Sequence, residues 1–226
     1  MDIFPLVNSL RVALISTGCT FFLGMWAAYG ISRCPRLLKG ALDCVLTLPL
    51  VLPPTVVGFF LLKTIGPKAP IGALVLRLFD SKLTMTWYSA IFATIIVTFP
   101  LMYRTARGAF ETFDPRLAAS AQTLGLSNRM IFWQIRVPNC KAGLMAGAVL
   151  SFARALGEYG ATSMVSGYIP GKTATISTTV YHLWREGNYS EAYLWVLINL
   201  AISLLVLLAV NALERKQPRA RREVHV

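Results

Sequence analysis

The stretch that decides the fold reads DPRLAASAQTLGLSNRMIFWQIRVP, residues 114–138. Asp114 is a favourable helix N-cap, and Pro115 follows it at the first helical position, where its missing N–H costs nothing. Gly125 predicts the end of this helix, because glycine adopts the left-handed C-cap conformation without a Cβ clash. The stretch therefore begins with a short, well-delimited helix.

A second short helix follows the first in this stretch. Ser127 predicts its N-cap, and we expect Pro138 to end it. Four apolar or small residues are expected on one face of the first helix, where their size would let another surface come close: Leu117, Ala118, Ala121 and Leu124. The sequence predicts two helices in a polar loop that lies between long apolar segments.

Composition places this loop in a membrane protein. The chain has 226 residues, of which 55% are hydrophobic and 14% charged, with a mean hydropathy of +0.58; soluble domains carry about 25% charged residues. We expect an all-α, polytopic membrane helical bundle that forms a single domain over residues 1–226. The net charge of +12 would suggest nucleic acid in a soluble protein. Here the charges lie between apolar spans, so membrane topology explains them and no nucleic-acid partner is expected.

Apolar runs predict about five transmembrane helices, since about twenty apolar residues cross a bilayer. The expected spans are residues 12–31, 41–62, 87–103, 142–165 and 192–213, and the polar loop covers residues 104–141. An odd number of spans places the two termini on opposite sides of the membrane.

Positive charge predicts which side is which. The segments 32–40 and 104–141 together with the C-terminal tail hold fourteen Lys and Arg residues, against seven in the N-terminal segment and the loops 63–86 and 166–191. Cytoplasmic loops carry the excess of Lys and Arg. The N-terminus is therefore expected outside, and the C-terminus and the 104–141 loop in the cytoplasm.

The second span carries three prolines, Pro49, Pro53 and Pro54, followed by Thr55. Each proline removes a backbone hydrogen bond, and the freed carbonyl must meet protein or water because lipid offers no partner. One interpretation is a broken helix that lines a gate; the other is a kinked helix that serves packing.

The fourth span carries two patterns. Gly143, Gly147, Ser151 and Ala155 recur at four-residue spacing, which permits close helix packing within a subunit or across a dimer. Ser151, Arg154, Glu158 and Thr162 then give a polar strip, in which Arg154 and Glu158 are one helical turn apart. Ionisable residues at membrane depth face a bundle interior or water. The strip predicts either residues that border a translocation path or a neutralised pair that fixes packing.

The chemistry of an enzyme is not evident in this sequence. The four cysteines lack metal-type spacing, and no nucleophile–base pair stands out. We therefore predict no catalytic residues, no metal site and no enzymatic activity.

The spacing from Gly125 to Pro138, with small residues at 119–121, resembles the cytoplasmic loop of ABC importer permeases. The match is incomplete, since Ala119, Ser120 and Val137 stand where the family usually has Glu, Ala and Leu. The resemblance implies that residues 116–124 form the coupling helix, which docks on the ATP-hydrolysing subunit. The coupling residues it implies are Arg116, Leu117, Ala118, Ala119, Ser120, Ala121, Leu124, Gly125 and Pro138.

Four further segments resemble the molybdate, tungstate and sulfate branch of these permeases: residues 48–58, 99–102, 151–162 and 169–173. This resemblance implies a type I importer permease that forms a translocation path as a homodimer. It also implies cytoplasmic ABC ATPase subunits and an external binding protein that delivers a tetrahedral oxyanion. ATP and Mg²⁺ would bind the ATPase, so this chain is expected to hold no cofactor.

Molybdate is the expected cargo, with sulfate, thiosulfate or tungstate as alternatives. The gate and path candidates are Pro49, Pro53, Pro54, Thr55, Ser151, Arg154, Glu158 and Thr162. Two functions from other classes stay open at this point: a secondary transporter driven by an ion gradient, and an integral membrane enzyme.

Overall fold

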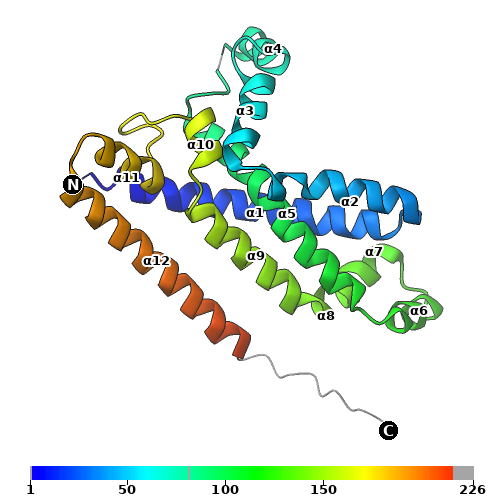
Figure 1. The fold of residues 1–226 in the computed structure, drawn as a ribbon. Helices are drawn as coiled ribbons and strands as arrows, with labels where there is room; N and C mark the ends of the chain where they lie inside the picture. Colours follow the sequence, from blue (N-terminus) through cyan, green and yellow to red (C-terminus); the bar gives the residue numbers. More distant parts are fainter. Residues whose placement is uncertain (1, 81, 216–226) are drawn as a thin grey trace.

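The computed structural model describes residues 2–80 and 82–215, and these residues form helices and connecting loops without a strand (Figure 1). The all-α prediction is confirmed. The helices are α1 Phe4–Ser32, α2 Arg36–Val51, α3 Pro54–Ile65, α4 Pro70–Phe79, α5 Trp87–Glu111, α6 Pro115–Thr123, α7 Asn128–Ile131, η1 Phe132–Arg136 (a π-helix), α8 Val137–Asn139, α9 Lys141–Leu156, α10 Gly160–Val165, α11 Ile176–Arg185 and α12 Tyr189–Arg215.

Helices α1, α5 and α9 pack on one another and form the centre of the molecule. Met102 and Tyr103 of α5 are fully buried there, against glycines on both neighbours. A Cβ on Gly24 of α1 would lie 2.8 Å from the Met102 Cγ, and one on Gly147 of α9 would lie 2.9 Å from the Met102 Sδ. The small-residue stripe of the fourth predicted span therefore serves packing within the subunit.

Three helices in the described part of the chain are long and apolar enough to cross a membrane: α1, α5 and α12. Helices α2 and α3 would count as a fourth span if they are taken together, although they are bent by 109° at their junction. The predicted span at 41–62 is thus a broken helix, which is one of the two interpretations that its prolines left open. Pro53 lies at the break with an extended ψ of 135°, and Pro54 occupies the first position of α3. A proline disfavours helical geometry in the residue before it, so Pro54 holds Pro53 in this extended conformation.

The helix at the predicted span 142–165 is also interrupted. Helix α9 ends at Leu156, and residues 157–159 separate it from the short helix α10. At the third predicted span, helix α5 continues to Glu111, well beyond the expected end at residue 103. The loop expected at 166–191 contains helix α11, which Thr175 and Thr178 start with a reciprocal capping box.

The arrangement of loops supports placing the basic segments 32–40 and 104–141 on one side of the membrane, as the count of Lys and Arg residues requires. The α1–α2 connection and helices α6 to α8 lie at one end of the bundle, whereas the N-terminus and α11 lie at the opposite end (Figure 1). Helices α3 and α4 project sideways from the bundle near its middle. The basic segments 32–40 and 104–141 are thus on a common side. The tail from residue 216 onward lies outside the described residues.

Candidate functional site

The first helix of the polar loop forms as predicted. The Asp114 Oδ1 accepts a hydrogen bond from the Arg116 amide at 2.8 Å, and Pro115 is the first residue of α6. Gly125 has φ +82°, its amide donates to the Gln122 carbonyl, and the Leu126 amide donates to the Ala121 carbonyl at 3.1 Å. These bonds close the helix with a left-handed glycine, which satisfies carbonyls that would otherwise be unpaired.

The four residues predicted on one face of α6 divide between two surroundings. Ala121 is buried, and Ala118 packs against the main core. Leu117 and Leu124 are 45% and 81% exposed. Alanines therefore attach α6 to the bundle, and the two leucines remain available to a partner. Arg116, Ala119 and Ser120 are exposed as well.

Pro138 does not end the second helix, contrary to the prediction. Ser127 caps α7 through its Oγ, which accepts from the Met130 amide at 3.3 Å. The chain then continues through η1 into α8, where Pro138 is the second residue. The Val137 amide bonds to the Phe132 carbonyl in the wider π-helical spacing. Proline has no backbone N–H to donate, and its ring needs room beside the preceding turn. The wider π-helical turn before Pro138 accommodates it.

The two broken spans meet each other. A Cβ on Gly160 of α10 would lie 2.9 Å from the Pro54 Cβ and 3.0 Å from the Thr55 amide nitrogen. A Cβ on Gly58 of α3 would lie 2.8 Å from the Ala161 Cα. Backbone therefore packs directly on backbone at this crossing, which only glycine permits. The structure brings the proline break and the break at residues 157–159 to one place.

Glu158 lies at the centre of this second break. Its side chain is 1% exposed, its Oε1 accepts from the Ala161 amide at 2.8 Å, and its Oε2 lies 2.7 Å from the Arg154 Nη1. The charge contact at Oε2 lacks the alignment of a hydrogen bond. Because Glu158 follows the end of α9, the predicted pair within one helix is instead a pair across a helix end. The carboxylate holds the start of α10 as well as the charge of Arg154.

The three predicted hydroxyl donors do not share one surface. Thr55 is exposed at the start of α3, whereas Ser151 and Thr162 are buried. The Ser151 Oγ has no hydrogen-bond partner among the residues that the structure describes. Thr94 of α5 has a buried hydroxyl in the same condition.

A polar network that sequence reasoning missed joins α2 to α5. The buried Tyr103 hydroxyl donates to Asp43, and Arg107 forms an ion pair with the same carboxylate. Glu111 then accepts from the Arg107 Nε at 2.9 Å and from the Lys39 Nζ at 3.0 Å. Asp43 is the sole charged residue within residues 41–62, and an ionisable group in an apolar span is a recognisable signal.

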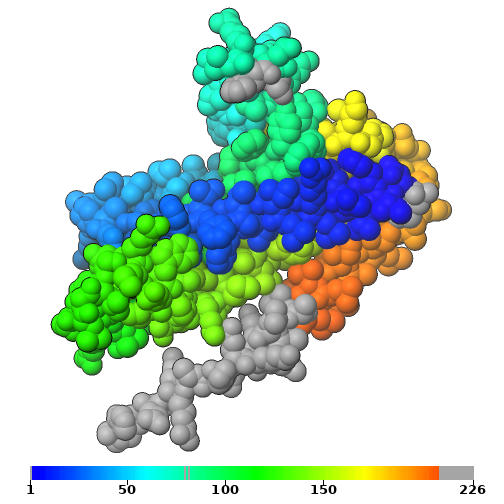
Figure 2. All heavy atoms as spheres, turned by 180° about the vertical axis from the view of Figure 1, so that it is seen from behind, coloured from blue at the N-terminus to red at the C-terminus, as the bar shows by residue number. Residues whose placement is uncertain are grey.

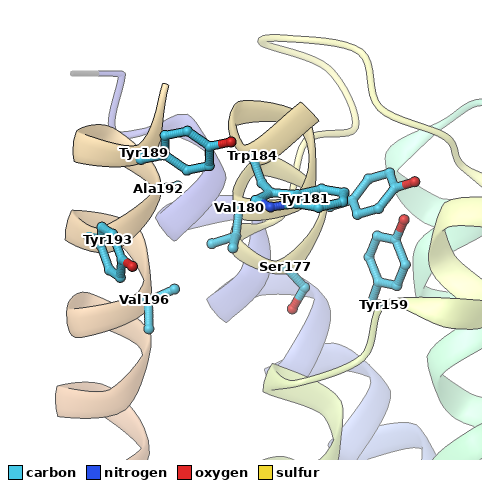
Figure 3. Close-up of a pocket in the computed structure, with 9 residues that line it drawn as sticks. All are labelled: Tyr159, Ser177, Val180, Tyr181, Trp184, Tyr189, Ala192, Tyr193 and Val196. Atoms are coloured by element: carbon cyan, nitrogen blue, oxygen red, sulfur yellow. The ribbon is translucent and has the colours of Figure 1, made fainter. Parts of the chain in front are cut away.

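An aromatic pocket of about 420 Å³ lies between α11 and α12, at the end opposite α6 (Figure 3). Tyr159, Tyr181 and Trp184 line one side, and Tyr189 and Tyr193 of α12 line the other. The Tyr159 and Tyr181 ring centroids are 5.2 Å apart. Since Tyr159 is the N-cap of α10, this pocket connects the second break to the outer helices.

Together, the membrane helices, the capped polar loop and the paired breaks define a membrane permease of a transport system. The chain belongs to the family described as "Binding-protein-dependent transport system inner membrane component", whose model matches residues 20–222. Membership makes this chain a multi-pass inner-membrane protein and confirms the prediction that it is a transport subunit.

Named relatives are similar along nearly the whole chain. The protein YvgM of Bacillus subtilis is 40% identical over 92% of this chain and 91% of its own length, and its name assigns it to a molybdenum transport system. The molybdenum transport system permease protein ModB of Escherichia coli K12 is 38% identical with the same coverage. The sulfate transport system permease protein CysW of Synechococcus elongatus is 32% identical over 95% of this chain and 74% of its own length.

Solved structures share the fold. A bacterial ABC transporter involved in the import of the acidic polysaccharide alginate superposes with a TM-score of 0.77, at 19% identity, over 96% of this chain and 80% of that one. The inward-facing MetNI methionine ABC transporter superposes with a TM-score of 0.71 at 12% identity. The prediction of an ABC type I importer permease fold is confirmed.

Proposed function

We propose that this chain is the permease subunit of an ATP-driven molybdate importer. The observation that carries the assignment is the sequence identity of 38–40% to two molybdenum transport permeases over 92% of the chain. Sulfate is the second candidate cargo, because a sulfate permease is 32% identical over 95% of the chain. Molybdate and sulfate are both tetrahedral dianions, so a common path suits either.

ATP hydrolysis belongs to a separate cytoplasmic subunit, which docks on α6. The exposed Leu117 and Leu124 give that helix an apolar surface, and its buried alanines attach it firmly to the core. Motion of the ATPase is therefore transmitted to the bundle. The chain itself needs no cofactor, since ATP and Mg²⁺ bind the partner.

Two copies of the chain enclose the path, and an external binding protein delivers the anion. The N-terminus is outside and the C-terminus is cytoplasmic, as the bias of Lys and Arg predicts. The loops 63–86 and 166–191 then face the binding protein. The aromatic pocket beside α11 lies on this outer end.

The crossing of the two broken spans serves as the gate. Helices α3 and α10 meet through Gly58 and Gly160, and both follow breaks in otherwise helical spans. Small rotations at these breaks would open or close the path between the two subunits. A dianion needs hydration and a few donors in such a path, without a tight site.

The test is ATP hydrolysis by the complex of this chain with its ATPase in lipid nanodiscs. Binding protein loaded with molybdate, tungstate or sulfate is added in turn, with unloaded binding protein as the control. We expect the molybdate-loaded form to stimulate hydrolysis most. Stimulation by the sulfate-loaded form alone would assign sulfate instead.

The chain reconstituted without its ATPase separates the other classes of function. Uptake that follows an ion gradient without any ATPase would identify a secondary transporter. Chemical turnover by the purified chain alone would identify a membrane enzyme. Either result would overturn the proposed function.

A further inference from the structure

A pocket of about 430 Å³ opens at the end of the bundle that carries the basic loops. Helix α1 and its C-cap contribute one wall, and α7 with η1 contributes the other. Its lining residues are Trp26, Tyr29, Gly30, Arg33, Asn128, Arg129, Phe132 and Trp133. Figure 2 shows α1 crossing this face of the molecule beside the segment that contains α6 and α7. Nothing in the proposed transport cycle uses this pocket.

The pocket carries positive charge that no ion pair among the described residues neutralises. The Arg33 guanidinium lies 4.1 Å from the Tyr29 ring centroid and donates to the Tyr29 hydroxyl. Arg129 lies on the opposite wall and is exposed. Among the described residues, no carboxylate forms an ion pair with Arg33 or Arg129, whereas Arg107 at the same end has two. The site therefore favours an anion.

The floor and rim of the pocket are aromatic. The Tyr29 and Phe132 ring centroids are 4.3 Å apart. Trp26 is 61% exposed and Trp133 is 42% exposed, one on each wall. Tryptophans collect at the level of lipid headgroups, where one part of the ring meets hydrocarbon and the other meets water. A small hydrated anion would gain little from these rings.

An apolar stripe leads into the pocket along one face of α1. Ile15, Cys19, Phe22 and Trp26 are spaced at four, three and four residues and are all exposed. At 100° per residue they share a face, and Gly30 and Arg33 continue it into the pocket. The stripe is long enough to hold a hydrocarbon chain beside the arginines.

We propose that this pocket binds an anionic phospholipid of the cytoplasmic leaflet. The phosphodiester lies between Arg33 and Arg129, the glycerol region lies against Trp26 and Trp133, and an acyl chain follows the stripe on α1. Basic pockets on the cytoplasmic side of membrane helices bind acidic headgroups by this chemistry. Because α7 directly follows α6, the lipid would hold the polar loop against the membrane surface. The proposal does not depend on the identity of the cargo.

The test uses the full-length chain in nanodiscs and reads its tryptophan fluorescence. Lipids with brominated acyl chains quench tryptophans that they contact. Brominated phosphatidylglycerol is titrated into phosphatidylcholine discs, and brominated phosphatidylcholine into phosphatidylglycerol discs. We expect half-maximal quenching at an about tenfold lower mole fraction of the brominated anionic lipid, because two basic residues near the headgroup favour it.

Matched variants remove the same charge from the same end of the molecule. Arg33→Gln with Arg129→Gln should abolish the preference for phosphatidylglycerol. Arg36→Gln with Arg104→Gln should keep it, since these exposed arginines do not line the pocket. If the first pair fails to fold, Arg129→Gln alone serves, because that change removes no ion pair among the residues that the structure describes.

Four results would overturn the proposal. The two brominated lipids could quench equally in the unmodified chain, or the control pair could lose the preference as fully as the pocket pair. Soluble glycerol phosphate could reverse the quenching, which would make the pocket a site for free phosphate esters. Finally, the fluorescence of the unmodified chain and of the Trp26→Phe with Trp133→Phe variant could both be unaffected by either brominated lipid. That result would show that protein covers the pocket.

Discussion

Gly125 shows at the scale of one residue how local chemistry sets the polar loop. Its φ of +82° is a conformation that other residues adopt at a cost, yet a Cβ there would meet no atom within 4 Å. Substitution therefore strains the backbone without a steric clash. The left-handed conformation costs roughly 1–2 kcal/mol for a residue with a side chain.

We expect Gly125→Val to displace α6 and to weaken the coupling of ATP hydrolysis to transport. Gly108→Ala is the matched control, because Gly108 lies inside α5 with open space around its Cβ position and an ordinary φ. That control should leave coupling intact and stabilise the helix by about 0.5–1 kcal/mol. The measurement is transport per ATP hydrolysed in proteoliposomes. Unchanged coupling in Gly125→Val would show that α6 is not the docking helix.

Cys140 gives a second prediction for a single residue. Burial raises the pKa of its thiol, and the nearby Arg136 opposes this only in part. Its Sγ also lies 3.2 Å from the Ala109 carbonyl oxygen. Since the thiolate is the reactive form, maleimide should modify Cys140 slowly at neutral pH. Cys34, which is partly exposed in the α1–α2 connection, should react faster than Cys140.

Single-cysteine variants of the folded chain measure both rates by mass spectrometry. Detergent-denatured protein gives the control, in which the two thiols should react alike. Rapid modification of Cys140 in the folded chain would show that the junction between α8 and α9 opens readily.

At the scale of elements, the Asp43 network fastens α2 to α5. The carboxylate meets both the buried Tyr103 hydroxyl and the Arg107 guanidinium. Asp43→Ala should leave the buried Tyr103 hydroxyl without its partner and Arg107 with Glu111 alone, and we expect a loss of on the order of 1–3 kcal/mol in stability. Lys39→Ala removes only the exposed pair with Glu111 and should cost under about 1 kcal/mol. Unfolding in detergent measures the difference, and equal losses would contradict the assignment.

Arg154 and Glu158 show how a helix end changes a prediction. The residues are four apart, which in a continuous helix predicts an exchangeable pair. In the structure Glu158 also accepts from the Ala161 amide, and an arginine at that position has no acceptor to offer. The double swap Arg154→Glu with Glu158→Arg should therefore remain inactive in transport. Glu158→Gln should retain more activity, because its side-chain oxygen can still accept. Recovery of transport in the double swap would show that the pair serves only to balance charge.

Local signals in the sequence predicted local structure well. The cap at Asp114, the glycine stop at Gly125 and the cap at Ser127 depend on neighbours within a few residues. The end of α9 was missed because Gly157 is surrounded by residues compatible with helix. The close contact of Gly160 with Pro54, which lies just beyond the break, depends on the assembled bundle. The burial of Ala118 could not be read from periodicity alone, since it depends on where the core lies.

At the scale of the whole molecule, two interrupted spans are fixed to each other by backbone contact. The sequence offered the prolines as a signal for the first break, but it offered no sign that Gly58 and Gly160 face the partner break. Their contacts join residues about a hundred positions apart and appear only when the bundle forms. The gate assigned to this crossing therefore depends on packing that no local pattern encodes.

Gly58→Ala tests whether that crossing works as a gate. The added methyl would lie 2.8 Å from the Ala161 Cα and 3.1 Å from its carbonyl oxygen, so α3 and α10 must separate. Gly18→Ala in α1 is the control, because its Cβ would meet nothing within 4 Å. We expect Gly58→Ala to keep assembly with the ATPase, since α6 is distant from the crossing. We expect its transport rate to fall at least about tenfold, because misplacement of a functional element by an ångström has effects of that size. Anion uptake and ATP hydrolysis measured on the same proteoliposomes separate the two effects. Normal uptake in Gly58→Ala would mean that the close approach serves stability alone, and the path would then have to open elsewhere between the subunits.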